Sequence, residues 1–238
     1  MRRAVLLVGV VPLALVACGG SKRPASSTSA LATLEAAAVK TVQAGSEHVS
    51  LEASANAGGQ KIALSGSGAF DTKNRRGTLH VDLSADTLSA AIDEVLDGTI
   101  VYARSPLLNA ALPAGKKWLK IDVAKAGKAS GFDLSLLAAQ DPGQALAFFR
   151  GLKSVTTIGQ ETVGGVSTTH YHAVQAGAAT YDAWVGDDGY IHRIRVVSTS
   201  GTKVTATTDL SDFGASVHVT VPSAAESFVT NSVPGLGG

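Results

Sequence analysis

Apolar and polar residues alternate along most of the chain after residue 45, and this period of two constrains the fold more than any other feature. Val49, Leu51 and Ala53, for example, alternate with serine and glutamate residues. Successive side chains of a β-strand point to opposite faces, so such alternation predicts a half-buried strand. About eleven segments show it, at 49–54, 62–70, 79–83, 87–96, 99–104, 117–122, 155–163, 166–174, 180–186, 191–198 and 203–213.

Short turn motifs separate these segments and indicate antiparallel hairpins. Gly164-Gly165 and Asp187-Asp188-Gly189 each lie between two alternating runs, as hairpin turns do. Residues 87–96 fit a helix as well as a strand that Glu94 interrupts, but the Asp97-Gly98 turn that follows favours the strand. Residues 217–219 are a candidate extension of the last strand.

Two regions have helical spacing instead. Residues 31–44 carry apolar side chains at intervals of three and four, and Gly45 ends the run. A helical insert is predicted between residues 134 and 150, where Asp141-Pro142 resembles a helix start. The fold class predicted is therefore α+β, with one antiparallel sheet of about eleven strands and helices on one face. A sheet of this size tends to curve.

The amino-terminal residues have the layout of a secretory signal. Arg2 and Arg3 precede an apolar, uncharged run from residue 4 to 17, and the chain's single cysteine, Cys18, follows. A cysteine at that place resembles the lipobox of bacterial lipoproteins, in which it receives a diacylglycerol. A short transmembrane anchor with an incidental cysteine is the alternative, but the run is shorter than the roughly 20 residues that a span needs.

This reading divides the chain into four parts. We expect a signal peptide at 1–17, a lipidated flexible tether at 18–30, one folded domain at 31–225 and a carboxy-terminal tail at 226–238. The protein would then be held by acylated Cys18 on the extracytoplasmic face of the cell membrane. Acylation would leave no thiol for disulfides or thiolate metal sites.

Composition limits the classes of partner. The formal net charge is +1, and no basic stripe interleaved with aromatic residues indicates a nucleic-acid partner. Hydrophobic residues make up 45% of the chain but aromatic residues only 5%. Small apolar side chains suit a core with an internal cavity, but a genome rich in alanine and glycine codons would give the same composition, so this point stays open.

The residues suggest no catalytic or metal centre. His170 and His172 share a strand face and could bind a metal with His80, His192 or His218, but no carboxylate lies at a telling spacing. A structural or surface role is therefore favoured for these histidines. The Ser65-Gly66-Ser67-Gly68 run is interpreted as turns or as strand positions with little side-chain bulk. No phosphate-binding loop or nucleophile elbow is present. We predict a protein that is not an enzyme and has no cofactor or metal; a Ser/His/Asp triad assembled across the fold is left open.

Four stretches resemble the LppX/LprAFG family of mycobacterial lipoproteins, relatives of the LolA/LolB lipoprotein carriers. The likeness covers about residues 31–222. Its stretches are Val101-Tyr102 with Pro106 and 115–122; 163–166 with 168–171; 183–185 with Asp188-Gly189 and Arg193; and 212–214 with 217–222. Family members usually have a second proline where this chain has Ser223.

The resemblance implies a half-open, LolA-like antiparallel barrel with helices covering its concave face. It also implies an apolar cavity for the acyl chains of lipids or lipoglycans, and the handling of those lipids at the cell envelope. A membrane transporter is a candidate partner. The alternative function is an interaction or sensor lipoprotein without lipid cargo.

Alternation and the predicted helical insert select a set of candidate lipid-binding residues. Trp184 could equally be a core anchor, and the residues of the insert could simply pack on the sheet. The set is Leu64, Leu79, Val81, Ile100, Leu137, Leu146, Phe149 and Trp184.

Overall fold

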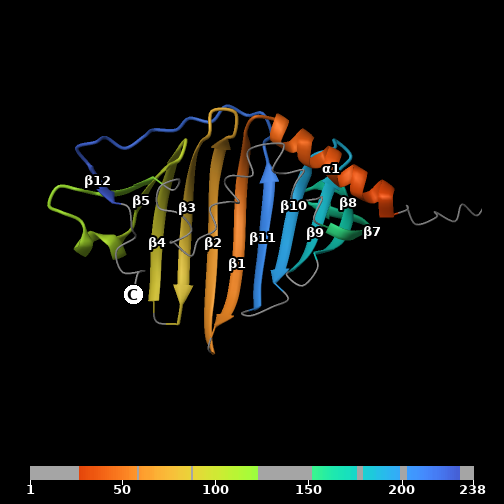
Figure 1. Ribbon diagram of the computed structural model, residues 1–238, viewed down its shortest axis with the longest axis horizontal. Helices are drawn as coiled ribbons and strands as arrows, with labels where there is room; N and C mark the ends of the chain where they lie inside the picture. Colours follow the sequence, from red (N-terminus) through yellow and green to blue (C-terminus); the bar gives the residue numbers. More distant parts are fainter. Residues whose placement is uncertain are drawn as a thin grey trace, which may run out of the picture.

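A computed structural model describes residues 27–57, 59–86, 88–122, 152–175, 179–198 and 203–230. These residues form one open sheet of twelve strands, with β12 and β7 at its two edges (Figure 1). The elements are α1 Ser27–Gln43, β1 Glu47–Ala57, β2 Gln60–Asp71, β3 Arg76–Ala85, β4 Leu88–Asp97, β5 Ile100–Arg104, the 3-10 helix η1 Pro106–Ala111, β6 Trp118–Asp122, β7 Leu152–Val163, β8 Val166–Gln175, β9 Ala179–Gly186, β10 Ile191–Ser198, β11 Lys203–Ser211 and β12 Ser227–Thr230.

The sheet consists of two antiparallel meanders joined side by side. Strands β1 to β6 follow one another in space, as do β7 to β11. The first strand of one meander pairs with the last strand of the other, in a register that places Ala53 opposite Ala206. Every strand predicted from alternation is present, including residues 88–97, whose helical reading is thereby excluded.

The carboxy-terminal part of the chain differs from the prediction. Strand β12 lies within the segment expected to be a tail, and it pairs parallel to β6, with Phe228 opposite Leu119. The sheet is therefore mixed, and it has one strand more than the alternating segments indicate. Residues 217–219, a candidate strand extension, are not in a strand.

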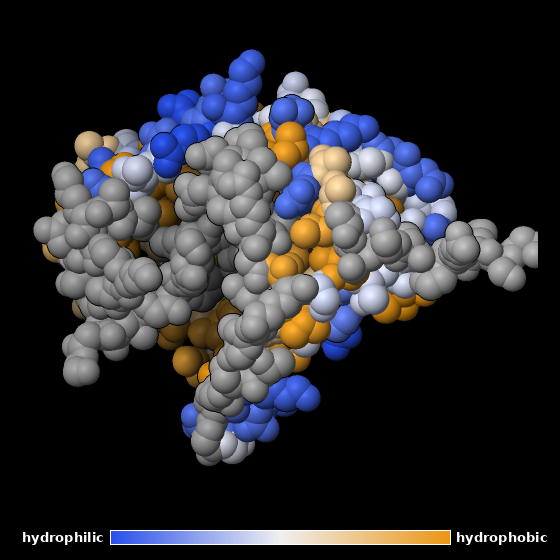
Figure 2. Space-filling model, turned by 45° about the vertical axis from the view of Figure 1, so that its right-hand side comes forward, coloured by the Kyte–Doolittle hydropathy of each residue, from blue (hydrophilic) through white to orange (hydrophobic). Residues whose placement is uncertain are grey.

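The sheet has one apolar face and one polar face. Cross-strand partners point to the same side, so the row Leu83, Leu64, Ala53 and Ala206 defines one face. The next row, Asp82, Ser65, Glu52 and Thr207, defines the other. We call these the apolar face and the polar face. In the view of Figure 2, hydrophobic side chains gather in the middle and hydrophilic ones lie along the upper and lower borders.

Helix α1 covers one end of the apolar face. It packs mainly against β7, β9 and β10 (Figure 1). Ala30, Leu34, Ala37 and Ala38 form a buried cluster with side chains of these strands and β8, among them Val155, Tyr171, Ala173 and Ala183. The alanines let the helix approach the sheet closely. The helix begins at Ser27 rather than at residue 31, within the segment expected to be a tether.

Three glycines on the apolar face bring strands β2 and β3 close together. A Cβ atom on Gly68 would lie 2.1 Å from the Thr78 carbonyl oxygen, and one on Gly66 would lie 2.6 Å from that of His80. A Cβ on Gly77 would lie 2.2 Å from the Phe70 ring. Gly66 and Gly68 are therefore strand positions with no room for a side chain, in agreement with the prediction.

The prediction that helices cover the concave face is met only in part. Among the described residues, α1 covers the β7–β10 end. The predicted helical insert at 134–150, the signal peptide and Cys18 lie outside the described residues. Within those residues, no helix is both long and apolar enough to span a bilayer. The predicted domain boundaries stay predictions.

Candidate functional site

A second apolar cluster occupies the other half of the apolar face, away from the helix. It is built by β1 to β5, whereas α1 packs mainly on β7, β9 and β10. Its centre is buried and consists of Phe70, Leu79, Val81, Leu96 and Val101. Partly buried side chains surround that centre, namely Val49, Leu51, Leu64 and Ile92. We call these nine residues the β1–β5 cluster.

Three of the predicted lipid-binding residues lie together in this cluster. Leu79 and Val81 point from β3 to the apolar face, and Leu64 points the same way from β2. Alternation identified their common face correctly, because the backbone of both strands is regular over these positions. Leu137, Leu146 and Phe149 lie outside the described residues.

Ile100 lies on the opposite face from these three, and its assignment as a lipid-binding residue stays a prediction. The two-residue turn at Gly98-Thr99 places Ile100 directly opposite Asp97, and Asp97 pairs with Arg76 on the polar face. The neighbouring Val101, opposite Leu96, is the residue that joins the apolar cluster. In a short strand, a shift of one position reverses the side-chain direction.

Trp184 also points to the polar face. It lies opposite His170 on β8 and Arg193 on β10, and its ring stacks on that of His170 with 4.3 Å between centroids. Its indole Nε1 donates a hydrogen bond to Glu161 Oε2 at 2.7 Å. A buried tryptophan needs such an acceptor. Trp184 therefore anchors a polar cluster and does not line the apolar face.

Charged side chains surround this tryptophan. His170 contacts Glu161 through Nδ1 at 2.8 Å and Asp182 through Nε2 at 3.0 Å, and His172 contacts the same Asp182 at 2.8 Å. The hydrogen bond from Trp184, followed by that from His170, lowers the pKa of Glu161. Among the described residues, no group of three or more histidine, cysteine or acidic side chains is arranged to hold a metal.

Two carboxyl groups on the apolar face were not identified as site residues from the sequence. Glu94 lies opposite Leu79 and Ala103, and Glu47 lies opposite Phe70. Burial raises the pKa of both groups, that of Glu47 to about 7. The sequence contained one signal for this site, because Glu94 occupies an inward position of an otherwise apolar pattern. Glu94 was interpreted above as an interruption of the strand.

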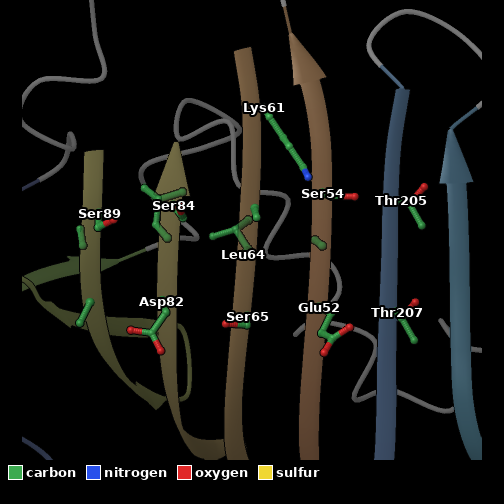
Figure 3. A pocket seen from close by; sticks show the side chains of 15 residues that line it. Glu52, Ser54, Lys61, Leu64, Ser65, Asp82, Ser84, Ser89, Thr205 and Thr207 are labelled. Atoms are coloured by element: carbon green, nitrogen blue, oxygen red, sulfur yellow. The ribbon is translucent and has the colours of Figure 1, made fainter. Parts of the chain in front are cut away.

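A wide groove of about 790 Å³ lies on the polar face, across β1 to β4 and β11. Figure 3 shows hydroxyl and carboxylate side chains extending from neighbouring strands along it. Its polar lining consists of Glu52, Ser54, Lys61, Ser65, Asp82, Ser84, Ser89, Thr205 and Thr207. Hydrocarbon placed over these groups would remove them from water without replacing their hydrogen bonds, which is unfavourable. The groove is therefore a poor site for acyl chains.

The described chain thus forms an open, mainly antiparallel sheet with a helix on its apolar face. The chain matches the family model described as "Predicted periplasmic protein (DUF2092)" over residues 84–221, and it belongs to this family. No curated protein matches the sequence.

The chain is similar to several solved structures, and the alignment with LprF shows the fold. LprF from Mycobacterium bovis aligns with a TM-score of 0.57 at 14% identity, covering 84% of this chain and 99% of that one. The lipoprotein LppX from Mycobacterium tuberculosis aligns at 0.49 and 14% identity, covering 82% and 100%. A LolA superfamily protein from Nitrosomonas europaea aligns at 0.30 and 11% identity, covering 77% and 91%. The resemblance to the LppX/LprAFG lipoproteins is thereby confirmed at the level of the fold.

Proposed function

We propose that this protein is a membrane-anchored, non-enzymatic lipoprotein that binds the acyl chains of a lipid or lipoglycan on its apolar face. It carries or presents them at the cell envelope. The observation that supports this proposal is the β1–β5 cluster, which lies on the same face as α1 but beyond the strands on which the helix mainly packs. Its centre is buried and its surrounding side chains are partly buried.

The free energy available to such a ligand is large. Each methylene removed from water contributes about 0.8 kcal/mol, so about ten buried methylenes contribute about 8 kcal/mol before the cost of association. This contribution needs no catalytic group. It depends on the size and dryness of the apolar surface, which Gly66 and Gly68 widen because they place no side chain on it.

The sequence and the family support an extracytoplasmic location. The family is described as periplasmic, and the signal-like residues before Cys18 would direct the chain across the membrane and attach it there. A membrane transporter as a further partner remains part of the proposal.

A fluorescent acyl probe tests the function with two adjacent variants. Leu64→Trp adds bulk to the apolar face, whereas Ser65→Trp adds the same bulk to the polar face, because neighbouring strand residues point in opposite directions. We expect Leu64→Trp to weaken probe binding about tenfold or more. Ser65→Trp should bind as the wild type does, and circular dichroism would check that both variants fold.

Native mass spectrometry of protein made in an envelope-bearing host supplies the second measurement. A co-purifying lipid in stoichiometric amount is the expected result. No lipid, together with no probe uptake by the wild type, would overturn the carrier function and favour an interaction or sensor lipoprotein. Turnover of a chromogenic ester that a single serine substitution abolishes would instead indicate an esterase.

A further inference from the structure

Glu94 places a carboxyl group in the middle of an apolar surface. On β4 it lies between Ile92 and Leu96, the neighbours that share its face, and across the sheet it faces Leu79 and Ala103. Three of these four neighbours, Ile92, Leu96 and Leu79, belong to the β1–β5 cluster. A leucine would fit this pattern, so the carboxyl group itself requires an explanation.

The Glu94 carboxyl group is not engaged by the rest of the described chain. It forms no hydrogen bond or ion pair with a residue in the described ranges. Burial is the cause that raises its pKa. A carboxyl group that is removed from water without a partner destabilises the folded state.

A small hollow adjoins Glu94. Its volume is about 10 Å³, and its lining includes Phe70, Gly77, Leu79, Leu96 and Val101. The hollow is close to the size of a single water molecule. It exists because Gly77 has no side chain and the Phe70 ring lies over the glycine instead. The site is thus a carboxyl group beside a space for one small polar group, with apolar walls.

Glu47 is a second carboxyl group on the apolar face, next to Phe70. It lies directly opposite Phe70 on β1, also points to the apolar face, and is partly buried. Burial raises its pKa to about 7. Two carboxyl groups therefore lie on the face that we assign to acyl chains.

We propose that Glu94 is the binding point for a hydroxyl group of the amphiphile whose hydrocarbon lies on the β1–β5 cluster. This inference rests on the proposed function and names the chemistry that its site selects. The protein would thus distinguish hydroxyl-bearing lipids from plain hydrocarbon chains of the same length.

The surroundings of Glu94 favour a hydroxyl group over an ammonium group. A carboxyl group accepts a hydrogen bond from a hydroxyl group in either protonation state. An ammonium group would have to lose its water on the same apolar surface, and the attraction of a buried ion pair often fails to offset that cost.

Competition against the fluorescent acyl probe tests this inference with three amphiphiles of equal tail length. Hexadecane-1,2-diol can donate hydrogen bonds, hexadecyl methyl ether cannot, and hexadecylamine presents an ammonium group. We expect wild-type protein to bind the diol about tenfold more tightly than the ether, which is the effect of about one well-placed hydrogen bond to a carboxyl group. In Glu94→Leu the two should bind within about twofold of each other.

Two controls separate selectivity from folding. Glu94→Leu should retain ether binding and unfold at a temperature at least as high as the wild type, because an unpartnered carboxyl group is removed. Glu52→Leu removes a carboxyl group from the polar face of β1 and should leave the ratio of diol to ether affinities unchanged.

Four results of these binding experiments would overturn the inference. Equal affinities of the wild type for diol and ether, or a preference that survives Glu94→Leu, would overturn the inference while leaving acyl-chain binding intact. Tighter binding of the amine than of the diol would show that the carboxyl group selects cations and would also overturn it. No uptake of the fluorescent probe by the wild type would overturn the proposed function, and this inference with it.

Discussion

Glu47 illustrates how one residue on the apolar face couples stability to pH. Burial disfavours the charged form and raises the pKa of Glu47 in the folded protein from its ordinary value of 4.5 to about 7. The folded state therefore holds this proton more tightly than the unfolded chain does. Stability from this group is highest below pH 4.5 and is lost as the pH rises toward and through 7.

We therefore predict that Glu47→Gln reduces the fall in unfolding free energy between pH 5 and pH 7.5. The difference between variant and wild type should be about 2 kcal/mol at the higher pH, allowing for the partial exposure of the side chain. Urea unfolding at the two pH values measures it. Glu52→Gln, on the polar face of the same strand, should keep the wild-type slope; an unchanged slope in Glu47→Gln would contradict the assignment.

Gly77 is a second residue whose environment makes a sharp prediction. A Cβ atom there would lie 2.2 Å from the ring of Phe70, which is buried. Gly77→Ala should therefore destabilise the protein by about 1–3 kcal/mol through overpacking. Gly159→Ala is the matched control, because no heavy atom lies within 4 Å of a Cβ at that position.

Thermal and urea unfolding of both glycine variants would check this prediction. Gly159→Ala should be close to neutral. Equal effects of the two substitutions would show that the loss of glycine, rather than contact with Phe70, determines the result.

At the scale of elements, the contact between α1 and the sheet depends on one threonine as well as on apolar packing. Thr41 Oγ1 accepts a hydrogen bond from the Ile191 backbone amide at 2.9 Å and donates one to the Ala37 carbonyl at 2.8 Å. The sheet register between β9 and β10 is irregular between Ile191 and Arg193. The helix thus supplies a partner for an amide beside this irregular position.

We predict that Thr41→Val destabilises the protein by about 1–3 kcal/mol, because the Ile191 amide would be left buried without a partner. Thr41→Ser keeps the hydroxyl group and should lose less. Faster amide exchange at Ile191 in the valine variant, measured by hydrogen–deuterium exchange, would assign the effect to this bond. If valine and serine behaved alike, the methyl group and not the hydrogen bond would be responsible.

At the scale of the whole molecule, the apolar face is divided between two kinds of cover. α1 and its small side chains cover the β7–β10 end. The β1–β5 cluster is the part to which we assign the ligand. An acyl ligand that binds the folded state only must raise its stability by mass action.

We therefore predict that an acyl ligand present at about 100 times its Kd stabilises the wild type by about 2.7 kcal/mol. Differential scanning calorimetry would detect the shift in Tm. The Leu64→Trp variant should show a smaller shift at the same ligand concentration, and a water-soluble alcohol of four carbons should cause none. A shift equal in both proteins would place the ligand elsewhere.

Much of the local structure could be predicted from the sequence, because local rules control it. Alternation located every strand up to β11, and the glycine-containing turns located the hairpins. The inward direction of Leu64, Leu79 and Val81 also followed, since they lie in long, regular strands. Strand β12 escaped detection because it has four residues and pairs with a strand far away in the chain.

Alternation does not predict the direction of a side chain where pairing between distant strands decides it. Ile100 lies on the polar face because of its turn partner Asp97, and Trp184 lies there because its indole N–H has Glu161 as an acceptor. The position of Glu47 and Glu94 on the apolar face likewise follows from the register of strand pairing.

The sequence by itself determined the strands, the turns and the signal-like start before Cys18, because each depends on neighbours a few residues apart. Only the tertiary structure decided which strands meet, which face each side chain takes and where α1 covers the sheet. Pairing of β1 with β11 joins residues far apart in the chain, and a change of one residue in register reverses the face of every side chain in a strand.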